Sequence, residues 1–246
     1  MTSHSERTAI VTGAAGGLGR ALVTKLANVG IHVMALDRVG KIPRDVDVLP
    51  NVHWIECDVT DGAAVETAIQ HIADLRGGID ILVNNAGLLS GHRPLEVIDA
   101  QEMRQYFEVN AVGPLLMVQS CLPYLRDSKH RGRIVNVASR TFFTGAPGRL
   151  AYVASKGALL GMTRVMANEL GEHGITVNAA IPSQIATPGT REHSSEESFS
   201  TTMQRQALKE FVTPEDFAGL VAFLVSPEAR MVTGQSIVCD GGAVMR

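Results

Sequence analysis

The stretch "RTAIVTGAAGGLGRALVTKLANVG", residues 7–30, joins a β-rich run to a glycine-rich turn and a helical pattern. Residues 7–12 predict a strand, and residues 17–30 predict a helix that ends at Gly30. The glycines of "TGAAGGLG" (12–19) allow a tight turn and let backbone N–H groups approach a pyrophosphate. Negative charge is also favoured at the N-terminus of a helix. This stretch therefore predicts a strand–turn–helix unit that binds a dinucleotide.

Asp37 stands eighteen positions after Gly19, at the end of a second predicted strand over residues 31–37. A carboxylate there can accept hydrogen bonds from the adenosine ribose hydroxyls, and it repels the additional phosphate of NADP. Asp37 therefore favours NAD over NADP, although the neighbouring guanidinium of Arg38 could help to hold a phosphate. The alternative for Asp37 is an ordinary turn residue at the end of a strand.

The alternation of strand and helix continues to the end of the chain. The strand 79–85 shows no polar alternation, which is typical of a parallel strand with both faces buried. We expect an α/β fold with one doubly wound parallel sheet of seven strands, helices on both faces, and a single domain over residues 1–246. The other expected strands are 52–58, 132–139, 175–181 and 234–240, and the other expected helices are 61–76, 99–127 (with a possible break at Gly113-Pro114) and 152–172.

One segment departs from this alternation. Residues 183–211 are polar, rich in Ser and Thr, and weakly patterned. A loop of this length inside a compact domain is usually functional or mobile. We expect a substrate-covering lid with short helices, and the alternative is a passive surface insertion.

Composition excludes several classes of protein. The 246 residues are 45% hydrophobic and carry a net charge of −3 without a long basic run, so we expect no nucleic-acid partner. The N-terminus has no apolar signal core and no apolar run reaches membrane-spanning length, which predicts a soluble, cytoplasmic protein without a membrane partner. Cys57, Cys121 and Cys239 lack disulfide or metal-ligand spacing, and the eight His residues are scattered, so we expect no catalytic metal.

The stretch "SRTFFTGAPGRLAYVASK", residues 139–156, contains a second chemical pattern. Tyr152 and Lys156 are four residues apart and lie on one face of a predicted helix. An ammonium group held beside a phenol can make the phenol a proton donor or acceptor. Alone, the pair could equally be a surface lysine and a half-buried tyrosine.

These motifs together resemble the short-chain dehydrogenase/reductase family in its classical form. The resemblance rests on Thr12-Gly13-x-x-x-Gly17-x-Gly19, on "NNAG" (84–87), and on Ser139, Tyr152 and Lys156, and it extends from about residue 7 to the end. It implies a Rossmann-like fold and an NAD(P)-dependent oxidoreductase. The cofactor-binding positions that it implies are Gly13, Gly17, Leu18 and Gly19 at the turn, Asp58 and Val59 at the adenine, Asn85, Ala86 and Gly87 along the cofactor, and Pro182, Ile185 and Thr187 at the nicotinamide, where Ser183 replaces a usual glycine.

The resemblance also implies catalytic roles. Tyr152 would be the base in alcohol oxidation and the acid in carbonyl reduction. Lys156 would lower the pKa of Tyr152 and hold the nicotinamide ribose, so that both residues also contact the cofactor. Ser139 would orient the substrate oxygen. Asn110 would support a water-linked proton path to Lys156, or would make only a structural hydrogen bond.

Three functions remain open from the sequence. The first is an NAD-dependent oxidoreductase that interconverts a small secondary, possibly ring-bearing, alcohol and its carbonyl by hydride transfer. The second is an NADPH-dependent ketoreductase of the 3-oxoacyl reductase type, and the third is a non-catalytic dinucleotide-binding redox sensor. Phe142 and Phe143 could form an apolar wall for a ring or pack beneath their loop. Arg140, His92 and Arg149 could pair with an acidic substrate group or face water.

The expected assembly is a homotetramer. The predicted helices 99–127 and 152–172 match those that pair between subunits in the family, and their apolar residues exceed what one face needs to bury. These residues are Leu115, Leu116, Val118, Leu159 and Met162. The C-terminal "DGG" would serve structure and subunit contact.

Overall fold

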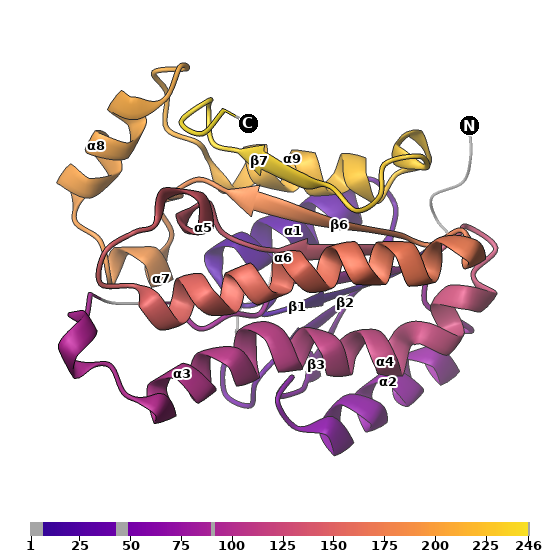
Figure 1. The fold of residues 1–246 in the computed structure, drawn as a ribbon. Helices are drawn as coiled ribbons and strands as arrows, with labels where there is room; N and C mark the ends of the chain where they lie inside the picture. The colour runs from indigo at the N-terminus through magenta and orange to yellow at the C-terminus, as the bar shows by residue number, and fades with distance from the viewer. Residues whose placement is uncertain (1–6, 43–48, 90–91, 246) are drawn as a thin grey trace.

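The computed structural model describes residues 7–42, 49–89 and 92–245, and their seven strands form one parallel sheet (Figure 1). The strand order β3-β2-β1-β4-β5-β6-β7 reverses direction between β1 and β4, as in a doubly wound sheet. This confirms the predicted α/β architecture. The strands are β1 (Thr8–Thr12), β2 (His32–Asp37), β3 (Val52–Glu56), β4 (Ile81–Asn84), β5 (Arg133–Val137), β6 (Thr176–Pro182) and β7 (Ser236–Cys239).

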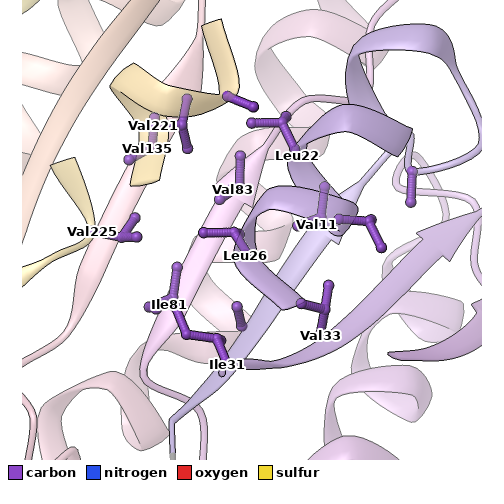
Figure 2. Packing of buried hydrophobic residues seen from close by; sticks show 14 of the residues in the cluster. Val11, Leu22, Leu26, Ile31, Val33, Ile81, Val83, Val135, Val221 and Val225 are labelled. Carbon is purple, nitrogen blue, oxygen red and sulfur yellow. The ribbon is translucent and has the colours of Figure 1, made fainter. Parts of the chain in front are cut away.

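Helices cover both faces of the sheet. In Figure 1, α1 (Gly17–Asn28) and α9 (Pro214–Leu224) lie behind the sheet, and α2 (Gly62–Arg76), α4 (Gly113–Asp127) and α6 (Leu150–Leu170) lie in front. Successive residues of a strand point to opposite faces of the sheet. Val11 thus packs in the cluster under α1 and α9, whereas Ile10 packs in the cluster under the front helices. Figure 2 shows the first cluster, to which Leu22 and Leu26 of α1 and Val221 of α9 all belong.

The predicted burial of the central strand is confirmed. Ile81, Leu82 and Val83 of β4 are each 0% exposed, with Leu82 on one face and its two neighbours on the other. Asp61 caps α2, because its carboxylate accepts hydrogen bonds from the backbone of Ala63 and Ala64.

The predicted helix over residues 99–127 is interrupted one turn earlier than expected. It consists of α3 (Ala100–Phe107), a π-helical turn (Glu108–Val112) and α4, so the break precedes Gly113-Pro114. A π-helical turn inserts one residue into the helical repeat and often marks a functional site. Here it carries Asn110.

Helix α9 was not expected from the sequence, although its start has a strong signal. Thr213 and Asp216 form a capping box and Pro214 occupies the first turn. Phe217 then anchors the helix at 0% exposure.

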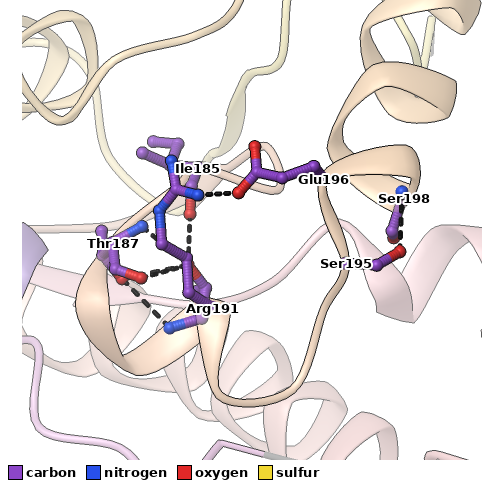
Figure 3. Close-up of polar contacts among 7 residues, drawn as sticks. Ile185, Thr187, Arg191, Ser195, Glu196 and Ser198 are labelled. Carbon is purple, nitrogen blue, oxygen red and sulfur yellow. Dashed lines mark hydrogen bonds and ion pairs between the residues drawn. The ribbon is translucent and has the colours of Figure 1, made fainter.

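Short helices gather at the carboxyl ends of the strands (Figure 1). They are α5 (Thr141–Thr144), α7 (Pro188–Arg191) and α8 (Glu196–Arg205), and the last two lie in the 183–211 segment. An ion pair between Arg191 and Glu196 joins α7 to α8, and the hydroxyls of Thr187 and Ser195 cap the two helices (Figure 3). Three 3₁₀ turns complete the described elements, at Leu95–Val97, Gly171–His173 and Pro227–Ala229.

Two of the apolar residues assigned to a subunit contact lie in the core instead. Val118 is 4% exposed and Leu159 is 1% exposed. Leu116 and Met162 are half-buried, and Leu115 is 37% exposed. Fewer apolar residues are therefore left on the surface of α4 and α6 for a subunit contact than the sequence indicated. Both helices bury a broader apolar face against the sheet than one narrow row of residues.

Within the described residues, no helix has the length and apolar character needed to span a membrane. The same residues contain no group of three or more His, Cys, Asp or Glu side chains that could hold a metal ion. Cys57, Cys121 and Cys239 are free thiols.

Candidate active site

A cleft of about 1130 Å³ opens at the carboxyl ends of the strands, where the strand order reverses. Ligands of doubly wound sheets bind at this position. Every residue that the sequence assigned to the cofactor or to catalysis lines the cleft except Asn110. The lining residues of this set are Gly13, Gly17, Leu18, Gly19, Asp37, Asp58, Val59, Asn85, Ala86, Gly87, Ser139, Tyr152, Lys156, Pro182, Ile185 and Thr187.

The glycine-rich turn has no room for side chains. Gly13 has a φ of 62°, and a Cβ atom on it would lie 2.7 Å from the Cα of Ala86. A Cβ on Gly19 would lie 2.2 Å from the carbonyl oxygen of Gly13. Gly16 caps α1 without a side-chain hydrogen bond, and the first turn of α1 has no acidic residue. The first N–H groups of α1 are thus left for an anion, which fits a dinucleotide pyrophosphate.

Thr12 and Asn85 hold the turn in place. The Thr12 hydroxyl accepts from the backbone N–H groups of Asn85 and Ala86, each at 3.0 Å. The Asn85 side-chain amide donates to the carbonyls of Thr12 and Gly13 at 2.9 and 3.0 Å. Asn85 therefore braces the turn with its side chain. The sequence assignment omitted Thr12, although its place at the end of β1 was a signal.

Asp37 lies at the opposite edge of the turn. One carboxylate oxygen accepts from the Ala15 backbone and the other from the Arg38 backbone, both at 2.8 Å. Asp58 accepts from the backbone and hydroxyl of Thr60, and the backbone hydrogen bond is the largest influence that lowers the pKa of Asp58. Arg38 and Lys41 also line this end of the cleft. Lys41 was missed because it stands beyond the strand.

The loop after β6 closes over the turn. A Cβ on Gly17 would lie 2.6 Å from the Cβ of Thr187, and Ile185 is 2% exposed. Ser183 keeps a backbone hydrogen bond to the Cys239 carbonyl at 3.0 Å. Its hydroxyl is buried and has no hydrogen-bond partner among the described residues. With serine at position 183, the backbone thus still pairs with the end of β7.

Ser139, Tyr152 and Lys156 come together deep in the cleft. Ser139 follows β5 and its hydroxyl lies 2.8 Å from the Thr141 hydroxyl. Tyr152 is 8% exposed, and burial raises its pKa, whereas a hydrogen bond from Ser139 and the charge of Arg149 lower it. Lys156 is 4% exposed and donates from Nζ to the Val137 carbonyl at 2.8 Å. Burial lowers the pKa of Lys156 to about 8.

These pKa directions differ from the expected electrostatics. Lys156 was expected to lower the pKa of Tyr152, but within the described chain the lowering comes from Ser139 and Arg149, and burial outweighs both. Lys156 directs its ammonium group to the Val137 carbonyl. Its charge is itself disfavoured by desolvation.

Asn110 lies behind the cleft at 0% exposure. Its carbonyl oxygen accepts from the Leu88 backbone at 2.8 Å, and its amide donates to the Ser155 hydroxyl at 2.9 Å. Ser155 in turn donates to the Tyr152 carbonyl at 2.8 Å. The Asn110 side chain thus joins the loop after β4 to α6. The neighbouring Val109 lines the cleft instead.

Phe142 and Phe143 pack edge to face against each other, with ring centroids 5.3 Å apart. A Cβ on Gly157 would lie 2.8 Å from the Phe142 ring, and Phe143 packs on the cluster that contains Leu160. Thr141 and Thr144 line the cleft in this region, whereas the two rings do not. Neither ring therefore forms an apolar wall of the cleft: Phe143 packs on the core, whereas Phe142 contacts α6 and stays 43% exposed.

Known proteins are similar to this chain in both sequence and fold. A family model described as enoyl-(acyl carrier protein) reductase matches residues 13–244. A 3-oxoacyl-(acyl-carrier-protein) reductase of Thermotoga maritima is 35% identical over 241 residues, which cover 96% of this chain and 97% of that protein. The L-2,3-butanediol dehydrogenase of Corynebacterium glutamicum is 32% identical over 253 residues, covering 96% of this chain and 98% of that protein.

A solved structure extends the likeness to three dimensions. The aldohexose dehydrogenase of Thermoplasma acidophilum, in ligand-free form, matches with a TM-score of 0.89 and 31% identity. The match covers 98% of this chain and 94% of that chain. With the parallel sheet, the glycine-rich turn and the Ser139–Tyr152–Lys156 arrangement, these likenesses lead to one conclusion: the chain belongs to the classical short-chain dehydrogenase/reductase family of NAD(P)-dependent oxidoreductases.

Proposed function

We propose that the protein is an NAD-dependent dehydrogenase that interconverts a small secondary or ring-bearing alcohol and its carbonyl. The observation that carries this proposal is one cleft that contains both the dinucleotide cradle and the side chains of Ser139, Tyr152 and Lys156. A buried phenol beside a serine hydroxyl can exchange a proton with a substrate oxygen. Hydrogen-bond donors in a buried site stabilise a developing charge on that oxygen more than donors in water do.

When bound, the nicotinamide supplies the hydride chemistry that the side chains lack. In the oxidative direction, Tyr152 acts in its ionised form, and its phenolate oxygen accepts the hydroxyl proton. Ser139 donates to the substrate oxygen and orients it. Lys156 holds the nicotinamide ribose and lowers the Tyr152 pKa in the loaded site. For Asn110 we propose support of the proton path to Lys156, through the position that it gives to the π-helical turn.

Asp37 is the basis for the choice of NAD. Its carboxylate lines the cleft and is fixed by two backbone hydrogen bonds. The deciding experiment measures the affinities of NADH and NADPH by calorimetry for the wild type and for Asp37→Ala, with Asp127→Ala as an exposed control. We expect NADH preference that collapses in Asp37→Ala alone. NADPH preference in the wild type would overturn the assignment of NAD.

A second candidate is an NADPH-dependent ketoreductase of the 3-oxoacyl reductase type. The exposed cations Arg38 and Lys41 line the cleft beside Asp37 and could hold the additional phosphate. The Thermotoga maritima relative carries a reductase name, which also favours this candidate. If NADPH is preferred, ketones rather than alcohols become the substrates to screen.

The remaining proposals concern the setting of this activity. We infer a single dinucleotide-binding domain over residues 1–246, with residues 183–211 as a lid over a small-molecule substrate. We further infer a cytoplasmic homotetramer that uses no metal.

A further inference from the structure

We propose that the substrate carries a carboxylate, which Arg140, Arg149 and Arg205 hold at the lid end of the cleft. This inference rests on the proposed dehydrogenase function and specifies its substrate class. All three arginines line the same cleft as Ser139 and Tyr152.

The three arginines reach this place from three different elements. Arg140 directly follows Ser139, and Arg149 caps the N-terminus of α6 three residues before Tyr152. Arg205 is the last residue of α8, in the 183–211 segment. Their convergence therefore follows from the fold and could not be read from one sequence motif.

Their charges act on one another and on the reacting phenol. Burial is the main effect on Arg140 and lowers its pKa, and the charge of Asp240 comes next and raises it. Arg205 and Arg149 both lower the pKa of Arg140, which is the expected result of like charges held together. Arg149 also lowers the pKa of Tyr152. The positive field thus extends from the lid to the catalytic hydroxyl.

The charges are not neutralised by ion pairs within the described chain. The ion pairs found there join Arg93 to Glu102, His173 to Glu172 and Arg191 to Glu196. Asp240 faces Arg140, but its carboxylate accepts hydrogen bonds from three backbone N–H groups of residues 242–244. Glu192 and Glu197 line the cleft as exposed residues of the 183–211 segment.

Arg140 is held in a fixed orientation. Its Nη2 donates to the Thr202 hydroxyl at 2.9 Å, and Thr202 donates to the Gln184 carbonyl oxygen at 2.7 Å. The Gln184 amide donates to the Ser198 hydroxyl at 2.9 Å. This chain of hydrogen bonds ties a half-buried guanidinium to α8, so that binding at the arginines and the position of α8 are coupled.

A carboxylate is the partner that this arrangement favours. A guanidinium offers planar pairs of N–H donors that match the two carboxylate oxygens. An anion among three cations also removes their mutual repulsion in a region partly shielded from water. Because Arg149 and Arg140 adjoin the catalytic side chains, the carboxylate belongs to the molecule whose hydroxyl meets Tyr152.

Matched pairs of probes test this inference. The first measurement compares the oxidation of 4-(1-hydroxyethyl)benzoate with that of 1-phenylethanol, in wild type, Arg149→Gln and Arg205→Gln. Arg230→Gln is the control, because Arg230 is exposed and outside the cleft. We expect the acid to have the higher kcat/KM, and the acid-to-neutral ratio to fall about 10- to 100-fold in Arg149→Gln, the range for a lost charge-assisted hydrogen bond. Arg205→Gln should also lower the acid-to-neutral ratio. Any effect on the Tyr152 pKa is common to both alcohols and cancels in this ratio.

A binding measurement separates this inference from the proposed function. Calorimetry of 4-acetylbenzoate and acetophenone on the protein with NAD needs no turnover, because the oxidised cofactor has no hydride to transfer to a ketone. Tighter binding of the acid that is lost in Arg149→Gln would support the arginine site even if neither alcohol is oxidised, in which case only the dehydrogenase proposal fails.

Equal affinities for the two ketones, or an acid-to-neutral ratio unchanged by Arg149→Gln, would overturn the inference and leave the dehydrogenase proposal standing. An equal loss of NADH affinity in Arg149→Gln would assign the arginine to the cofactor, and would also overturn it.

Discussion

Lys156 lies on α6 with 4% of its surface exposed, and its ammonium group donates to the Val137 carbonyl. Burial removes water from the ammonium group and disfavours its charged form, so the pKa of Lys156 falls to about 8. Tyr152, one turn away, is affected in the opposite direction, because burial raises the pKa of an acid that ionises to an anion. The two pKa values therefore move apart and change order, so burial alone keeps the phenol protonated and makes the ammonium group the first of the two to lose its proton.

The lowered pKa of Lys156 predicts a pH-dependent stability. Between pH 8 and its ordinary pKa of 10.5, the unfolded chain keeps a proton that the folded chain has released, so the free energy of unfolding rises with pH in this window. The free energy of unfolding of the wild type, relative to that of Lys156→Met, should rise by about 3 kcal/mol from pH 7 to above pH 10. Urea unfolding of both proteins at several pH values measures this gain. A constant difference between them would contradict the lowered pKa.

Ser155 predicts a positioning effect. Its buried hydroxyl links the Asn110 amide to the Tyr152 carbonyl. In Ser155→Ala the Asn110 amide loses the shorter of its two hydrogen bonds and keeps the one to the Leu88 carbonyl, so the free energy of unfolding should fall by about 1–3 kcal/mol. The fall in kcat should exceed any change in KM, because the phenol is less well placed. Ser200→Ala on exposed α8 serves as the control, and equal behaviour of the two variants would refute the link.

At the scale of elements, the turn between β1 and α1 is the most constrained part of the site. The carbonyl of Gly13 occupies the space that a side chain on Gly19 would need. This contact brings the N-terminus of α1 close to the strand, where its free N–H groups face the cleft.

Replacement of Gly19 by alanine should therefore weaken both folding and cofactor binding. The new Cβ would force the helix away from the Gly13 carbonyl at a cost of about 1–3 kcal/mol, and NADH affinity should fall with it. Gly219→Ala on α9 is the matched control, because nothing lies within 4 Å of its Cβ position. That variant should gain about 0.5–1 kcal/mol from helix propensity. Thermal unfolding and NADH calorimetry on both variants measure these effects.

The sequence allowed the sheet, and the meeting of Ser139, Tyr152 and Lys156 in one cleft, to be predicted because their signals are local. Each signal is contained in a short stretch of sequence: an apolar run, the glycine spacing, or the four-residue offset from Tyr152 to Lys156. The π-helical turn at Asn110 was not predicted, since a 3.6-residue period continues on both sides of it. The convergence of Arg205 on Arg140 was not predicted either, because it depends on how the 183–211 segment folds back over the cleft.

At the scale of the whole molecule, charge is distributed unevenly. The chain has a net charge of −3, yet arginines line the substrate end of the cleft. A locally positive cleft on an acidic protein attracts anionic substrates and leaves the outer surface repelled by nucleic acid.

The proposed assembly gives a prediction at this scale. Light scattering should report a mass about four times the 26.3 kDa of one chain. Leu115→Glu on α4 should lower this mass, because a charge would be buried in the subunit contact. Leu208→Glu, at a 66% exposed position outside these helices, should leave it unchanged. A monomeric wild type would contradict the assembly.

The most direct test of the catalytic account is Tyr152→Phe, which removes one hydroxyl from a buried ring. The measurement is NADH formation with NAD and the best ring-bearing secondary alcohol, together with NADH affinity by calorimetry. We predict that turnover falls at least about 100-fold while NADH affinity stays within about threefold of the wild type. Turnover within tenfold of the wild type would show that Tyr152 is not the acid–base group and would contradict the account.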